Sequence, residues 1–266
     1  MKYFTAFTPH PPIIVPDIGG KELAKVQNTV NAMKTLADKI VEFTPDVMFL
    51  VSPHAPIDRG SIPIFVPEHG KYIGDLYQFG SYFSIGVPVW LDFIEKFLKD
   101  RPPYVKFYGY SHLDHASLVP LYYLWDAYVR HSKQMPMMVL IGYDILATGE
   151  DYYNLGMLLR DYVEKTFPKA KILYLASGDL SHRLIPGAPA GYNPRGKDFD
   201  RLVVESIKSW NKDMYLSIPD DLREDAGECG YLSFASGMGF AGENAQSTVL
   251  SYEGPFGVGY MVAYAM

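Results

Sequence analysis

The sequence has very little cysteine and no concentrated block of basic charge. Cys229 is its only cysteine, so no internal disulfide can form, and we expect the protein to work in a reducing, cytoplasmic compartment. Its 24 lysines and arginines are outnumbered by 30 aspartates and glutamates, which gives a formal net charge of −6. Because proteins that bind nucleic acid normally carry a stripe of Lys and Arg, we expect no nucleic-acid partner.

Long hydrophobic segments are also missing. The most apolar runs, residues 47–51 and 137–141, have the length of β-strands, far below the ~18 residues that a membrane-spanning helix needs. The first residues, MKYFTAFTPH, lack the apolar stretch of a signal peptide. We therefore expect no membrane partner. Hydrophobic residues still make up 48% of the 266-residue chain, which is enough to build a sizeable core.

Several common catalytic motifs are absent from the sequence. It contains no Cys-x-x-Cys pair, no His-Glu-x-x-His, no Gly-x-Ser-x-Gly and no Gly-x-x-x-x-Gly-Lys-Ser/Thr phosphate loop. These absences count against the commoner classes of hydrolase and nucleotide-binding protein.

The sequence does contain an alternation of strand-like and helix-like segments. Short apolar runs typical of strands occupy residues 3–8, 46–52, 137–142, 172–176 and 248–252. Apolar residues spaced by three and four, as on one face of a helix, occupy residues 23–40, 89–98, 155–167 and 199–210. This alternation predicts an α/β fold with helices on both faces of a sheet. No Ser/Gly/Pro-rich linker divides the chain, so we expect a single domain over residues 1–266, with residues 185–196 as a long surface loop that is a candidate lid.

Two proline-flanked histidines follow the first two predicted strands. His10 lies in Thr-Pro-His-Pro-Pro and His54 in Ser-Pro-His-Ala-Pro. Proline on both sides stiffens each loop, and in open α/β sheets ligands bind beyond the carboxyl ends of the strands. An incidental histidine in one such turn would mean little, but the repetition at equivalent positions predicts that both imidazoles bind one metal ion.

Two further polar clusters accompany this pair. The segment SGDLSH follows the predicted strand 172–176, and its Asp179 either orients an imidazole or merely caps a helix. His112 and His115 flank Asp114 in a segment that also reads as a solvated turn. His69 and His131 lie in polar surroundings without such context, and we assign them to the surface.

A pair of histidine ligands calls for a carboxylate. Two histidines and one carboxylate form the usual site of a non-heme Fe(II) that activates oxygen, and a zinc hydrolase uses the same ligand types. The ligand types alone therefore leave the metal open between iron and zinc.

Taken together, these motifs resemble a known family. PHPP, SPHAP, LDHASLVPL, SGDLSH, AGECGY and YEGPFGVGY resemble, in order and spacing, the catalytic B subunits of class III extradiol ring-cleavage dioxygenases. The resemblance runs from His10 to about Tyr260. It implies a three-layer α/β fold with a central, mostly parallel sheet, and a cofactor Fe(II) held by two histidines and a glutamate. It also implies a catechol-like aromatic substrate, cleaved with O2, and a homo-oligomer with or without a small companion subunit.

The resemblance also implies roles for individual residues. His10 and His54 become the histidine ligands, and His182 becomes the acid/base that exchanges protons with the substrate. His115 becomes a catalytic residue that contacts the substrate or supports the ligands. We expect Asp179 and His112 to bind the substrate or to support the ligands.

The third ligand is predicted to be Glu228. The glutamates that follow SGDLSH are Glu205, Glu224, Glu228, Glu243 and Glu253. Glu228 has small neighbours, precedes an apolar helical run and matches the late glutamate of the family, whereas Glu253, at a strand exit, is its main rival.

Two other interpretations stay open. Memo-like proteins of the same superfamily have a cysteine near the position of Glu228, and Cys229 lies directly beside it. The chain would then be a metal-binding or partner-binding protein without dioxygenase turnover. A weaker alternative is a divalent-metal hydrolase that uses His182 as its base.

Overall fold

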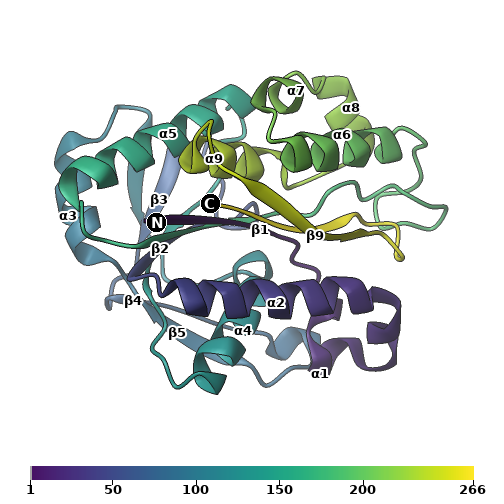
Figure 1. The fold of residues 1–266 in the computed structure, drawn as a ribbon, viewed down its shortest axis with the longest axis horizontal. Coiled ribbons are helices and arrows are strands. Elements are labelled where there is room, and N and C mark those ends of the chain that lie inside the picture. Colours follow the sequence, from purple (N-terminus) through teal and green to yellow (C-terminus); the bar gives the residue numbers. More distant parts are fainter. Residues whose placement is uncertain (1) are drawn as a thin grey trace.

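The computed structural model describes residues 2–266 and is built around an eight-stranded sheet with the strand order β6-β3-β7-β2-β8-β1-β10-β9 (Figure 1). Strand pairs β1–β8, β8–β2, β2–β7 and β3–β6 are parallel. Strands β10 and β9 extend one edge in antiparallel order. The strands are β1 (Tyr3–Thr8), β2 (Val47–Val51), β3 (Ile62–Val66), β6 (Val105–Gly109), β7 (Met137–Ile141), β8 (Ile172–Ser177), β9 (Ser247–Glu253) and β10 (Tyr260–Ala265). A separate hairpin pairs β4 (Lys71–Asp75) with β5 (Ser84–Pro88).

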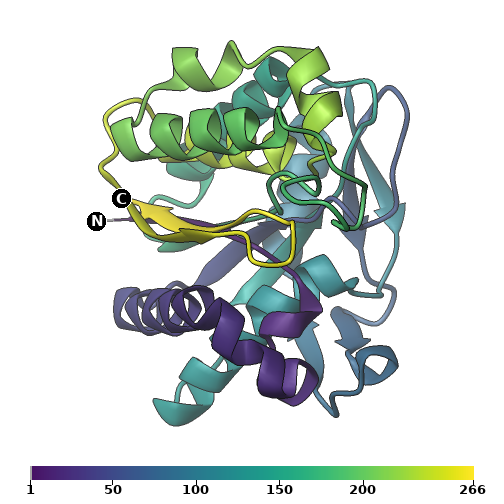
Figure 2. The same cartoon turned by 90° about the vertical axis from the view of Figure 1, so that its right-hand side faces the viewer.

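Helices cover both faces of this sheet, so the predicted three-layer α/β architecture is confirmed (Figure 2). On one face lie α2 (Gln27–Phe43) and α4 (His115–Arg130). On the other lie α5 (Gly149–Thr166), α6 (Gly196–Ser209) and α9 (Tyr231–Ala241), and α3 (Leu91–Asp100) packs against α5. Shorter elements are α1 (Pro16–Gly19), α7 (Lys212–Leu216), α8 (Asp220–Ala226) and the 3-10 helices η1 (Pro12–Ile14), η2 (Gly20–Val26) and η3 (Tyr77–Phe79). No helix within residues 2–266 has both the length and the apolar character to cross a membrane.

The central strands end together at one edge of the sheet. Val51 of β2 is in register with Ile141 of β7 and with Ala176 of β8, and Phe7 of β1 is in register with the same Ala176. These strands are buried on both faces, which explains why they appear in the sequence as unbroken apolar runs. The loops that follow β1, β2 and β8 therefore leave the sheet side by side.

Several boundaries and elements differ from the sequence expectations. The helix expected over residues 23–40 begins at Gln27, because residues 20–26 form a 3-10 helix. The sequence did not predict helix α4. Ten of its residues are buried, so it has no clear polar stripe, and Pro120 interrupts the helical pattern. The segment 178–195 has no helix or strand, which agrees with the surface loop expected at 185–196; its function as a lid stays a prediction.

Helices α5 and α9 approach each other closely through glycines. A β-carbon on Gly156 of α5 would collide with the main-chain oxygen of Ser236, and one on Gly239 of α9 would collide with that of Tyr153. Because main-chain oxygens cannot swing aside as flexible side chains do, only glycine fits at these two positions. This contact fixes α9, and with it the turn that leads into α9 from the end of the sheet.

We expect Gly156→Ala to destabilise the protein by about 1–3 kcal/mol, because overpacking outweighs the better helix propensity of alanine. Urea unfolding measures the difference. The control is Gly109→Ala, where no atom lies within 4 Å of the added β-carbon; it should change stability by less than about 0.5 kcal/mol. Equal effects of the two changes would contradict the close-packing argument.

Candidate metal centre

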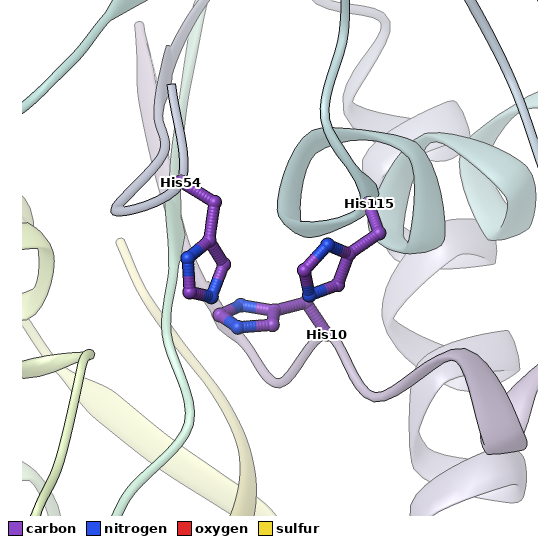
Figure 3. Close-up of side chains that lie close together, drawn as sticks. All are labelled: His10, His54 and His115. Carbon is purple, nitrogen blue, oxygen red and sulfur yellow. The ribbon is translucent and has the colours of Figure 1, made fainter. Parts of the chain in front are cut away.

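Three histidines meet beyond the carboxyl edge of the sheet. His10 follows β1, His54 follows β2, and His115 is the first residue of α4. One ligand nitrogen of each lies within 4.8 Å of the others. The ring centres are 5.0 Å apart for His10 and His54, 5.5 Å for His10 and His115, and 4.7 Å for His54 and His115 (Figure 3). Imidazoles at this spacing form a donor set for one divalent metal ion.

The aligned strand ends and a side-chain bridge explain this convergence. Ser52, the first residue after β2, donates its hydroxyl to Asp114 Oδ1 at 2.8 Å and accepts the amide N–H of His54 at 3.2 Å. Asp114 is also the N-cap of α4, where its side chain accepts the N–H of Ser117 at 2.9 Å. The loop that carries His54 and the helix that begins with His115 are thus tied to one carboxylate.

The three rings are neutral at neutral pH. Desolvation, followed by the neighbouring His54, His115 and His182, lowers the pKa of the buried His10 well below its ordinary value. Desolvation likewise lowers the pKa of His115. It also lowers the pKa of His54, although the His54 side chain is partly open to solvent. Since a metal binds the deprotonated imidazole, these rings are ready to accept one.

A thiol lies beside this group. Cys229 Sγ is 3.6 Å from His10 Nε2 and 3.4 Å from the amide nitrogen of Asp179, which donates to it. The carboxylate of Asp179 accepts the main-chain N–H of His10 at 2.9 Å. Burial, followed by Asp179, raises the pKa of the Cys229 thiol. Asp179 therefore holds His10 and Cys229 together and does not cap a helix.

The carboxylate of Glu228 has other partners. It accepts from Arg223 Nε at 3.2 Å and from the N–H of Tyr231, the first residue of α9, at 2.7 Å. Burial raises its pKa, and Arg223 opposes this rise. Within residues 2–266 the metal-competent group comprises the three histidines without Glu228. The role of Glu228 as a metal ligand therefore stays a prediction from the sequence.

Glu253, the other glutamate considered as a third metal ligand, binds the first turn of α2 instead. Its carboxylate accepts the N–H of Thr29 at 2.8 Å and the hydroxyl of Thr29 at 2.6 Å, in the first turn of α2. A carboxylate at a helix N-terminus satisfies otherwise unpaired N–H groups. This structural task explains the glutamate at the end of β9.

His182 lies close to the histidine group but is not part of it. Desolvation lowers its pKa, and His54 lowers it further, whereas the backbone of Gly227 and of Leu180 raises it. Its Nδ1 is buried and has no hydrogen-bond partner within residues 2–266. The preceding Ser181 is held by Asp200, whose carboxylate accepts its N–H at 2.7 Å. A neutral ring next to the site, with an unpartnered Nδ1, is suited to exchanging protons.

The remaining histidines lie outside the group. His112 and His69 are exposed, and His131 faces Asp38 on the surface at 3.4 Å. The structure does not bring His112 to the metal-competent group.

Sequence reasoning missed Tyr143, which follows β7. Its hydroxyl donates to the main-chain oxygen of Cys229 at 2.9 Å and accepts the N–H of Ser233 at 2.8 Å. No motif marked this tyrosine; only its place directly after a buried strand, as for His10 and His54, could have drawn attention to it.

Comparisons with known proteins identify the family of the chain. A family described as the catalytic LigB subunit of aromatic ring-opening dioxygenase matches residues 4–263. Protein CA_C1420 of Clostridium acetobutylicum is 34% identical in an alignment that covers 96% of this chain and 55% of that protein. The chain thus spans about half the length of this curated relative. The crystal structure of uncharacterized protein JW3007 from Escherichia coli K12 matches 99% of both chains with a TM-score of 0.68 at 17% identity, a likeness of fold alone.

We expect His54→Ala and His115→Ala each to weaken the binding of a divalent metal by at least about tenfold, since removing even a supporting residue of a metal site costs this much. Metal content after loading and dialysis, together with a Co(II) titration, measures the loss. His131→Ala is the control and should bind metal normally, because His131 lies on the surface. Full metal retention in both site variants would contradict the three-histidine centre.

Proposed function

The chain belongs to the family of the catalytic LigB subunit of aromatic ring-opening dioxygenase, as its sequence motifs predicted, and we propose that it cleaves a catechol-like aromatic ring with O2 at an Fe(II) centre. The observation that carries this proposal is the convergence of His10, His54 and His115, with His182 beside them. Neutral imidazoles are ligands that suit iron as well as zinc and copper. The histidine centre and the family thus point to the same class of chemistry.

The residues divide the work in this proposal. When bound, the metal would supply positive charge that lowers the pKa of a substrate hydroxyl. His10 and His54 hold the ion, as the sequence predicted. His115, which the resemblance placed among the catalytic or supporting residues, becomes the third ligand in this proposal. Because His54 is exposed, we expect substrate and O2 to reach the centre from its side.

His182 handles the proton. Its lowered pKa keeps the ring neutral near pH 7, so it can accept a proton from a substrate hydroxyl and return it when the ring opens. The loop that carries it is fixed through Ser181 and Asp200, so the ring stays near the histidine group during the transfer.

One observation favours a second candidate, a Memo-like metal-binding protein without ring cleavage. The thiol of Cys229 lies 3.6 Å from His10 Nε2, whereas the carboxylate of Glu228 is bonded to Arg223. A thiolate in the ligand set would replace the carboxylate that oxygen-activating Fe(II) sites usually contain.

Two variants separate these candidates. The sequence predicts Glu228 as a ligand, but the proposal made here departs from that prediction. We expect Cys229→Ser and Glu228→Gln both to retain Fe(II), because three imidazoles hold it and the Glu228 carboxylate is already bonded to Arg223 and Tyr231. Metal analysis and the Co(II) absorption spectrum measure this. Loss of metal in Cys229→Ser, with a sulfur-to-cobalt band in the unmodified protein, would favour the second candidate. Loss in Glu228→Gln alone would establish the carboxylate ligand predicted from the sequence.

His182→Ala tests the proposed reaction. The protein is purified without oxygen, loaded with Fe(II) and assayed for oxygen uptake on substituted catechols. We expect the variant to keep its iron and to lose about 10²–10⁴-fold in kcat, the usual contribution of a general acid/base. His131→Ala should match the unmodified protein. If His182→Ala loses its metal, His182 is a ligand; if no catechol is consumed by the unmodified, iron-loaded protein, the ring-cleavage proposal is wrong.

A further inference from the structure

Helix α4 contains a proline that leaves one buried carbonyl without its helical partner. Pro120 lies inside the helix and has no N–H, so the main-chain oxygen of Ala116, four residues earlier, receives no hydrogen bond from it. Ala116 is fully buried, and a buried carbonyl without a partner is costly. The hydroxyl of Ser177, at the end of β8, supplies the missing bond, donating to this oxygen at 2.6 Å.

This bond determines what Ser177 offers to His10. A serine hydroxyl has a single proton, and that proton points to Ala116. Ser177 Oγ also lies 3.0 Å from His10 Nδ1, so in this second bond the oxygen must accept. The proton of the neutral His10 ring is therefore on Nδ1.

The other ring nitrogen, Nε2, then carries the lone pair that a metal needs. Its neighbour is the thiol of Cys229, whose Sγ lies 3.6 Å away and can donate to this lone pair without placing a ring proton there. The nearest carboxylate oxygen, Asp179 Oδ2, is 3.8 Å from Nε2, which is too far for a hydrogen bond that would hold a proton there. All three partners, Ser177, Ala116 and His10, are buried, so water does not compete for these bonds.

We propose that Ser177 is a positioning residue for His10: it keeps the ring proton on Nδ1 and the Nε2 lone pair directed to the metal, and Pro120 makes this possible by leaving the Ala116 carbonyl for the Ser177 proton. This inference rests on the metal site of the proposed function and not on its substrate. It links a proline in a helix, a serine at a strand end and a histidine after another strand.

The test uses the ring signals of the metal-free protein. Two-bond ¹H–¹⁵N spectra of histidine-labelled protein distinguish the two neutral tautomers, and the spectrum of His10→Gln identifies the His10 signal. We expect the Nδ1–H form in the unmodified protein. In Ser177→Ala a substantial share of the ring should move to the Nε2–H form, and Co(II) affinity should fall by about 10–100-fold, as for other supporting bonds of metal-ligating histidines.

Two comparisons separate this role from a general effect on packing. Ser236→Ala is the matched control, because Ser236 is equally buried and its hydroxyl donates to Ser233 inside α9, away from His10. Ser177→Thr restores a hydroxyl and should recover at least part of the Nδ1–H signal. If Ser177→Ala fails to fold, Pro120→Ala decides, since its new N–H competes for the Ala116 carbonyl and should also shift the tautomer.

The Nε2–H form in the unmodified protein would overturn the proposal. An unchanged His10 tautomer in Ser177→Ala would also overturn it, whatever happens to metal affinity. If Ser177→Ala does not fold, an unchanged tautomer in Pro120→Ala would overturn it instead. Because these spectra need neither metal nor substrate, a failure of the oxygen-uptake assay leaves this test intact.

Discussion

Asp179 is the junction on which the metal centre depends. Its carboxylate accepts the N–H of His10 at 2.9 Å, its main-chain oxygen accepts that of Gly230 at 3.0 Å, and its own N–H donates to Cys229 Sγ at 3.4 Å. Segments that follow β1 and β8 and the turn before α9 are thus joined through one residue. The contact is so close that a β-carbon on Gly178 would collide with the Cα of Gly230. The bond to His10 depends on the Asp179 side chain, whereas the bonds to Gly230 and Cys229 use its main chain.

The parts of this site that the sequence predicted follow from local rules. Unbroken apolar runs marked β2, β7 and β8, and parallel strands bring their exits to one edge, so the sequence alone was enough to place His10, His54 and the SGDLSH loop together. The position of His115 could not be predicted in this way, because it depends on the bond between Ser52 and Asp114, which are 62 residues apart. Helix α4 itself was hidden, since Pro120 and its largely apolar surface obscure the helical pattern.

The choice between Glu228 and Cys229 shows a second limit of the sequence. The two residues are adjacent, and the sequence offers both as metal ligands. In the folded chain Glu228 turns to Arg223 at the end of α8 and to the first N–H of α9, whereas Cys229 turns to His10. Which of two neighbouring side chains faces the site depends on how α8 and α9 are arranged around the turn. That arrangement is tertiary: it rests on the glycine contacts of α9 with α5 and on the bond from Tyr143 to Cys229.

Burial sets the charge of the candidate site when no metal is bound. Desolvation raises the pKa of Asp179 to about 7 and raises that of the Cys229 thiol, and it lowers the pKa of His10. These opposite shifts have one cause, because a poorly hydrated site disfavours every charged form. The metal-free site is therefore close to electrically neutral. A bound dication reverses this balance: its charge favours ionised Asp179 and Cys229, and the neutral rings already present their lone pairs. Poor hydration thus keeps the imidazoles uncharged, and it also leaves the charge of a bound divalent metal weakly screened.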